Sequence, residues 1–122
     1  MKLYLAGPMT GYPDLNFPHF HATAAQLRLQ GHEVVNPAEI NADTSAEWAA
    51  CMKQDIAQLV TCDGIAVLTG WDASRGARLE HHIATALGMP VHCAYELMAR
   101  EFQPGGNTPD NAERQKREGA AG

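Results

Sequence analysis

Short apolar segments alternate along the chain with longer segments in which apolar residues recur every three or four positions. The short segments lie at residues 3–6, 33–36, 65–69 and 91–94, and glycine or proline follows each of the first three. Such bounded apolar runs are typical of strands, and the longer period is that of helices. The alternation predicts a three-layer α/β domain, a parallel sheet with helices on both faces.

Helices are expected between and after these strands, over residues 16–31, 44–60, 74–87 and 95–102. Thr44 and Glu47 have the spacing of a capping box at the start of the second helix. Ser74 is the expected N-cap of the third. Gly31 and Gly88 follow the first and third helices, where a left-handed residue commonly ends a helix.

The composition changes after residue 102. Residues 103–122 have no apolar periodicity and are rich in Gly, Pro, Asn and charged residues. Such a segment has nothing to bury, which predicts a polar, flexible tail that is dispensable for folding. The folded domain is therefore expected over residues 1–102.

Charge, apolar runs and cysteine content argue against several classes of protein: nucleic-acid-binding, membrane-spanning and metal-binding. Nine basic against fourteen acidic residues give a net charge of −5, which is unfavourable for holding a nucleic-acid polymer. No apolar run approaches the roughly 20 residues that span a membrane. Three cysteines without metal-ligand spacing suggest free thiols in a reducing cytoplasm, and no metal site. A small nucleotide remains possible, because backbone amides can bind one phosphate.

The loops that follow the first three strands are expected to meet. In open α/β sheets with right-handed crossovers, ligands bind at the carboxyl ends of the strands. This places Gly7-Pro8-Met9, Asn36-Pro37 and Gly70-Trp71 at one edge of the sheet. Trp71 either stacks on a ligand base or packs in the core. Gly70 and Gly76 let the backbone approach a ligand closely.

Two acidic residues lie on helix faces that are otherwise apolar. Glu80 shares a helix face with Ala77, Ala84 and Leu87. Asp55 shares a face of the preceding helix with Trp48, Met52 and Leu59. Burying a carboxylate costs several kcal/mol unless it has a partner or a function. The alternatives are a Glu80 that only complements the helix dipole, and an Asp55 paired with an arginine or a backbone amide.

A pair of carboxylates suits glycosidic chemistry. One attacks or stabilises the sugar cation, and the other handles the proton of the leaving group. We expect the helix N-terminus to keep Glu80 ionised, as a nucleophile requires. Asp55, the more desolvated of the two, is then expected to hold a proton.

These residues together resemble the nucleoside 2-deoxyribosyltransferase superfamily over residues 2–91. That superfamily includes 2′-deoxynucleoside 5′-monophosphate N-glycosidases and small phage-borne relatives. The motifs that carry the resemblance are Tyr4-Leu5-Ala6-Gly7-Pro8, Asp55 with Cys62-Asp63, and Gly70-Trp71 followed by Ser74-x-Gly76-x-x-x-Glu80.

The resemblance implies a role for each matching residue. Glu80 matches the nucleophile that forms a glycosyl-enzyme intermediate at C1′, Asp55 an assisting acid, and Tyr4 a residue near the sugar. Ser74 and Gly76 match positions that hold the 5′ end of the substrate. The family fold is flavodoxin-like, with a Rossmann-like parallel sheet of four to five strands, in homo-oligomers. No cofactor is implied.

The chain departs from the monophosphate hydrolases in its first loop. Pro8 and Thr10 stand where those enzymes offer a serine and an arginine to the phosphate. The expected function is cleavage or transfer at the N-glycosidic bond of a small nucleoside or its 5′-monophosphate. The alternative is a catalytically inactive domain that binds or senses nucleotides on the same fold. Glu80 discriminates between them, because a binding domain does not need it.

Overall fold

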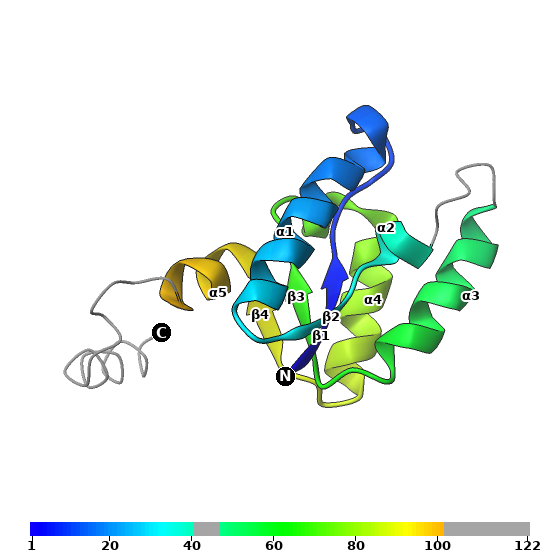
Figure 1. The fold of residues 1–122 in the computed structure, drawn as a ribbon. Coiled ribbons are helices and arrows are strands. Elements are labelled where there is room, and N and C mark those ends of the chain that lie inside the picture. Colours follow the sequence, from blue (N-terminus) through cyan, green and yellow to red (C-terminus); the bar gives the residue numbers. More distant parts are fainter. Residues whose placement is uncertain (41–46, 102–122) are drawn as a thin grey trace.

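The structure is a computed structural model that describes residues 1–40 and 47–101. Its centre is a sheet of four parallel strands in the order β2-β1-β3-β4 (Figure 1). The strands are β1 (Lys2–Ala6), β2 (Glu33–Val35), β3 (Gly64–Val67) and β4 (Val91–Cys93). The predicted parallel α/β architecture is confirmed.

Five α-helices surround the sheet within the described residues. They are α1 (Phe17–Leu29), α2 (Pro37–Ile40), α3 (Trp48–Leu59), α4 (Arg75–Ala86) and α5 (Ala94–Glu101). Two short 3-10 helices, η1 (Pro13–Asn16) and η2 (Trp71–Ala73), lie in the loops after β1 and β3. None of the helices in the described part of the chain has the length and apolar character that crossing a membrane requires.

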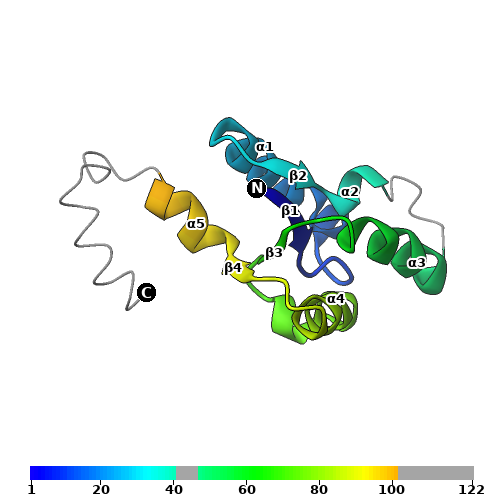
Figure 2. The same cartoon turned by 90° about the horizontal axis from the view of Figure 1, so that it is seen from below.

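The side chains of β1 alternate between two hydrophobic cores. Leu3 and Leu5 pack beneath α1 and α5, whereas Tyr4 and Ala6 pack beneath α3 and α4. Figure 2 shows these two helix pairs on opposite sides of the sheet. Since β1 lies between β2 and β3, it is covered on both faces and at both edges, and its residues 3–6 are fully buried.

Two of the predicted helix ends are confirmed in detail. After α1, the amide of Gly31 donates to the carbonyl of Arg28, and the amide of His32 donates to that of Leu27. Gly31 has a φ of +98°, and Gly88 has a φ of +77° after α4. The first pattern is a Schellman motif, in which a left-handed glycine satisfies the last helical carbonyls.

Several local expectations are wrong. Glu47 is the N-cap of α3 and makes no side-chain cap bond, so it does not occupy the third helical position that a capping box requires. Its proposed partner Thr44 lies outside the described residues. Leu87 is not on the buried face of α4, because it is the C-cap residue and 59% exposed. The start of α1 agrees with the prediction, since Asn16 is its N-cap residue, although the Asn16 side chain makes no cap hydrogen bond.

The second strand is shorter than expected, since β2 ends at Val35 and α2 follows at Pro37. The helix α2 was not predicted from the sequence. Residues 103–122, which were predicted to form a tail, lie outside the described part of the chain together with residue 102, so the domain boundary stays a prediction.

Candidate functional site

A cavity of about 620 Å³ opens where β1 and β3 end and where α3 and α4 begin. The loop residues expected to bind substrate line it: Gly7, Pro8, Met9, Ser74 and Gly76. Both carboxylates line it as well. The sequence-based expectation that these loops meet at one edge of the sheet is therefore confirmed.

Two buried carboxylates line this cavity, and a buried tyrosine donates a hydrogen bond to one of them. The hydroxyl of Tyr4 on β1 donates a hydrogen bond of 2.7 Å to Oε2 of Glu80 on α4. Asp55 on α3 lines the same cavity, and both carboxylates are only 5% exposed. Tyr4 is fully buried. The fold thus holds a hydrogen-bonded carboxylate and a second carboxylate in one cavity, both with little exposure to solvent.

Burial dominates the electrostatics of Glu80. It raises the pKa of this carboxyl to about 8; the Tyr4 hydrogen bond opposes the rise, and the charge of Asp55 adds to it. The expectation that the helix N-terminus keeps Glu80 ionised is wrong. Glu80 lies in the second turn of α4, and the helix dipole acts mainly within the first.

Tyr4 remains a proton donor in this environment. Its pKa is raised well above the usual value, first by burial and then by the charges of Glu80 and Asp55. A neutral phenol can donate to a carboxylate, whereas a phenolate could not. The Tyr4 hydroxyl therefore stabilises the ionised form of Glu80.

The start of α4 forms another part of the cavity wall. Ser74 is its N-cap, as predicted, and the Ser74 hydroxyl oxygen accepts from the amide of Ala77 at 3.3 Å. The next residue, Arg75, places its guanidinium 3.6 Å from the ring centroid of Trp48 at the start of α3. Arg75 is the only Lys or Arg among the described residues that line the cavity.

Gly76 allows the close approach of α3 and α4. A Cβ atom on Gly76 would lie 3.2 Å from the Met52 sulfur and 3.6 Å from Nε1 of Trp48. The sequence predicted instead that this glycine serves backbone access to a ligand. The position of Gly76 in the cavity wall is compatible with that role, but the close contacts that the structure shows for Gly76 are with side chains of α3.

Of the two roles that the sequence left open for Trp71, stacking on a ligand base or packing in the core, the structure shows packing, and Trp71 does not line the cavity. It stacks on His81, with ring centroids 4.3 Å apart, and packs against the core beneath α4. The tryptophan that lines the cavity is Trp48. Its spacing from Asp55, seven residues or two helical turns, places both on one face of α3, as the sequence predicted. The sequence did not assign Trp48 to the ligand cavity.

Sequence reasoning also missed part of the loop after β1. Tyr12 and Leu15 line the cavity together with Met9 and Thr10. The side-chain amide of Asn16 donates to the Pro8 carbonyl at 2.9 Å and closes this loop on itself. In residues 1–40 and 47–101, no group of three His, Cys, Asp or Glu side chains is arranged to hold a metal ion.

Comparisons with known proteins agree with this geometry. The family model described as "Domain of unknown function (DUF4406)" matches residues 1–93. A solved structure of a 2-deoxyribosyltransferase from Bacillus psychrosaccharolyticus is similar, with a TM-score of 0.58 and 25% sequence identity. The similarity covers 75% of this chain and 69% of that one. No curated protein matches the chain. The chain belongs to the DUF4406 family, within the nucleoside 2-deoxyribosyltransferase-like superfamily.

Proposed function

We propose that this protein cleaves or transfers at the N-glycosidic bond of a (deoxy)nucleoside or its 5′-monophosphate, with Glu80 as the nucleophile. The observation that carries the proposal is the buried hydrogen bond of 2.7 Å from Tyr4 to Glu80, a carboxylate that lines a cavity of about 620 Å³. The similarity to a 2-deoxyribosyltransferase supports an enzyme of that kind.

In the first step the ionised carboxylate of Glu80 attacks C1′ of the sugar. Tyr4 engages Oε2, which directs Oε1 to the sugar. The C1′–N bond breaks, its electron pair leaves with the base, and Asp55 gives that base a proton. A covalent glycosyl-enzyme ester remains.

In the second step a water molecule or a second base attacks C1′. Asp55 takes the proton of this nucleophile, and the ester bond breaks to release Glu80 as a carboxylate. Water gives hydrolysis, and a base gives transfer. Tyr4 stabilises the carboxylate both as attacking and as leaving group.

The 5′ end of the substrate is expected at the start of α4. Backbone amides at a helix N-terminus favour a phosphate, and Arg75 adds a positive charge to a cavity that otherwise holds two carboxylates. We therefore propose that a nucleoside 5′-monophosphate is preferred over the nucleoside.

The test incubates the protein with a panel of nucleosides and 5′-monophosphates and measures release of free base. We expect release from at least one substrate, and expect Glu80→Ala to lower the turnover number by 10²-fold or more. Near-normal turnover in Glu80→Ala would contradict the assignment of Glu80 as the nucleophile. Binding without release by the unmodified protein supports the alternative, an inactive nucleotide-binding domain.

A further inference from the structure

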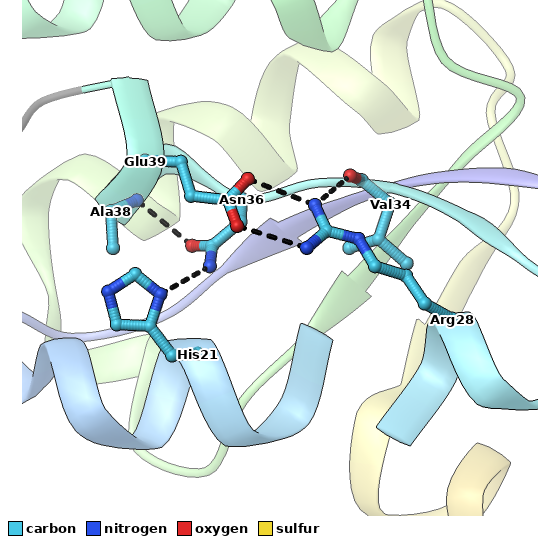
Figure 3. Close-up of polar contacts among 6 residues, drawn as sticks. All are labelled: His21, Arg28, Val34, Asn36, Ala38 and Glu39. Atoms are coloured by element: carbon cyan, nitrogen blue, oxygen red, sulfur yellow. Dashed lines mark hydrogen bonds and ion pairs between the residues drawn. The ribbon is translucent and has the colours of Figure 1, made fainter. Parts of the chain in front are cut away.

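A cluster of polar side chains joins α2 to α1 and β2 beside the cavity (Figure 3). Its centre is Asn36, which is only 1% exposed and directly follows β2. The Asn36 side-chain oxygen accepts from the amide of Ala38 at 2.9 Å. Asn36 is thus the N-cap of α2, and Pro37 occupies the first helical position, where its missing N–H costs nothing.

The hydrogen bonds of Asn36 fix the proton position on His21. Because the Ala38 amide can only donate, the side-chain oxygen of Asn36 must face it. The side-chain nitrogen then faces Nδ1 of His21 on α1, at 3.2 Å. An amide nitrogen donates, so Nδ1 of His21 must accept and carries no proton. One side chain therefore caps α2 and holds it against α1.

His21 also supports the cavity wall from the α1 side. Its ring meets the ring of Phe17 edge-on, with centroids 6.2 Å apart. Phe17, Phe20 and Pro37 all line the cavity. His21 therefore contacts one wall residue directly, and reaches Pro37 through Asn36.

A second connection runs from Arg28 to the same short helix. Its guanidinium donates to both carboxylate oxygens of Glu39 at 3.0 Å, and to the Val34 carbonyl at 2.8 Å. The Arg28 and Glu39 side chains are 41% and 46% exposed, and such pairs contribute little stability. The bidentate geometry nevertheless orients α2.

We infer that His21 and Asn36 are positioning residues, which hold Pro37 and Phe17 in the cavity wall and so set the affinity for the ligand. The inference rests on the proposed function in taking a nucleoside or its monophosphate as that ligand. Because a wall contact acts equally on bound substrate and transition state, its loss should raise KM and leave kcat nearly unchanged.

The test compares three variants of the full chain. His21→Ala removes the acceptor, and His21→Asn keeps an acceptor near the place of Nδ1. His19→Ala changes a second histidine of the same helix, which is exposed, as His21 is. We expect His21→Ala to raise KM about three- to tenfold, as loss of one hydrogen bond implies. His21→Asn should restore KM to within about twofold, and His19→Ala should leave it unchanged.

Hydrogen exchange separates this inference from the proposed function. In His21→Ala, the amides of α2 should exchange faster than in the unmodified protein, while those of α4 keep their rates. Unchanged exchange in α2 overturns the inference, as does faster exchange with an unchanged KM. A His21→Asn variant as impaired as His21→Ala also overturns it. If the unmodified protein releases no base, the proposed function fails, and exchange in α2 still decides whether His21 holds the wall.

Discussion

Glu80 carries the greatest conflict between local sequence and three-dimensional environment. By its place in the chain it is an acidic residue near the start of a helix, where the dipole favours its charge. In the fold it is 5% exposed, and burial raises its pKa to about 8. At pH 7 only about a tenth of such a group is ionised. The reaction proposed here should therefore depend on pH through Glu80.

The pH profile of kcat/KM should show this dependence. Below the Glu80 pKa of about 8 the carboxyl is protonated and cannot attack C1′. Activity should rise toward this value on the acid side, at up to about tenfold per pH unit, and fall again at higher pH as Asp55 loses the proton that it gives to the base. In Tyr4→Phe the hydrogen bond that lowers the Glu80 pKa is lost. The acid limb should then move to higher pH, so that activity falls more at pH 7 than at pH 9.

Tyr95→Phe is the matched control, since Tyr95 is 69% exposed and does not line the cavity. It should keep the profile of the unmodified protein. An acid limb that stays in place in Tyr4→Phe would show that Tyr4 does not act on the ionisation of Glu80.

At the scale of elements, the strands and helix ends that have a clear pattern in the local sequence were predicted. The strands were found because each is a short apolar run, and glycine or proline closes the first three of them. The ends of α1 and α4 were found because Gly31 and Gly88 follow them. The approach of Asp55 and Glu80 to one site followed from their shared anomaly, a carboxylate on an apolar face.

Elements set by side-chain contacts were not predicted. Asn36-Pro37 was interpreted as the end of a strand, although the same two residues can be the N-cap and first residue of a helix. Trp71 and Trp48 are equally large and apolar, and only the packing of η2 and α4 decides which one reaches the cavity. The depth of the cavity around Glu80 is a property of several elements together, so no local pattern reports it.

The start of α4 should determine whether the protein prefers a substrate with a 5′-phosphate or one with a 5′-hydroxyl. Ser74→Asp keeps a good N-cap residue but adds a negative charge beside Arg75. This charge should repel a 5′-phosphate and accept from a 5′-hydroxyl. The ratio of kcat/KM for a monophosphate to that for its nucleoside should therefore fall by about tenfold or more.

Ser74→Asn provides the control, because asparagine also caps helices well and carries no charge. It should keep most of the preference for the monophosphate. Equal kcat/KM for the two substrates in the unmodified protein would contradict the proposed preference.

At the scale of the whole molecule, the cavity draws on both helical layers. Phe20 and Pro37 come from α1 and α2, whereas Asp55 and Glu80 come from α3 and α4. The cavity lies at the carboxyl ends of β1 and β3, the central strands, so the best-packed part of the sheet supports it. This placement explains how the fold can hold two carboxylates in a site that penalises their charge.

That penalty should be visible in the stability of the whole protein. On folding, the Glu80 pKa rises from 4.5 to about 8. At a pH between these two pKa values, Glu80 is therefore protonated in the folded state and ionised in the unfolded state. The contribution of Glu80 to the free energy of unfolding is complete below pH 4.5 and is lost as the pH rises through about 8. The loss amounts to several kcal/mol, with about 5 kcal/mol as an upper bound.

Glu80→Gln removes the ionisation and keeps an acceptor for the Tyr4 hydroxyl. The free energy of unfolding of both proteins is measured with urea at about pH 5 and about pH 9. Between these pH values, the unmodified protein should lose several kcal/mol more than Glu80→Gln. The comparison between the two proteins cancels the titration of the groups that do not interact with Glu80. Glu96→Gln, which changes an exposed glutamate, should follow the unmodified protein. If the stabilities of the unmodified protein and Glu80→Gln change with pH in parallel, ionising Glu80 does not destabilise the folded state. The assignment of the pH dependence of activity to Glu80 would then be contradicted as well.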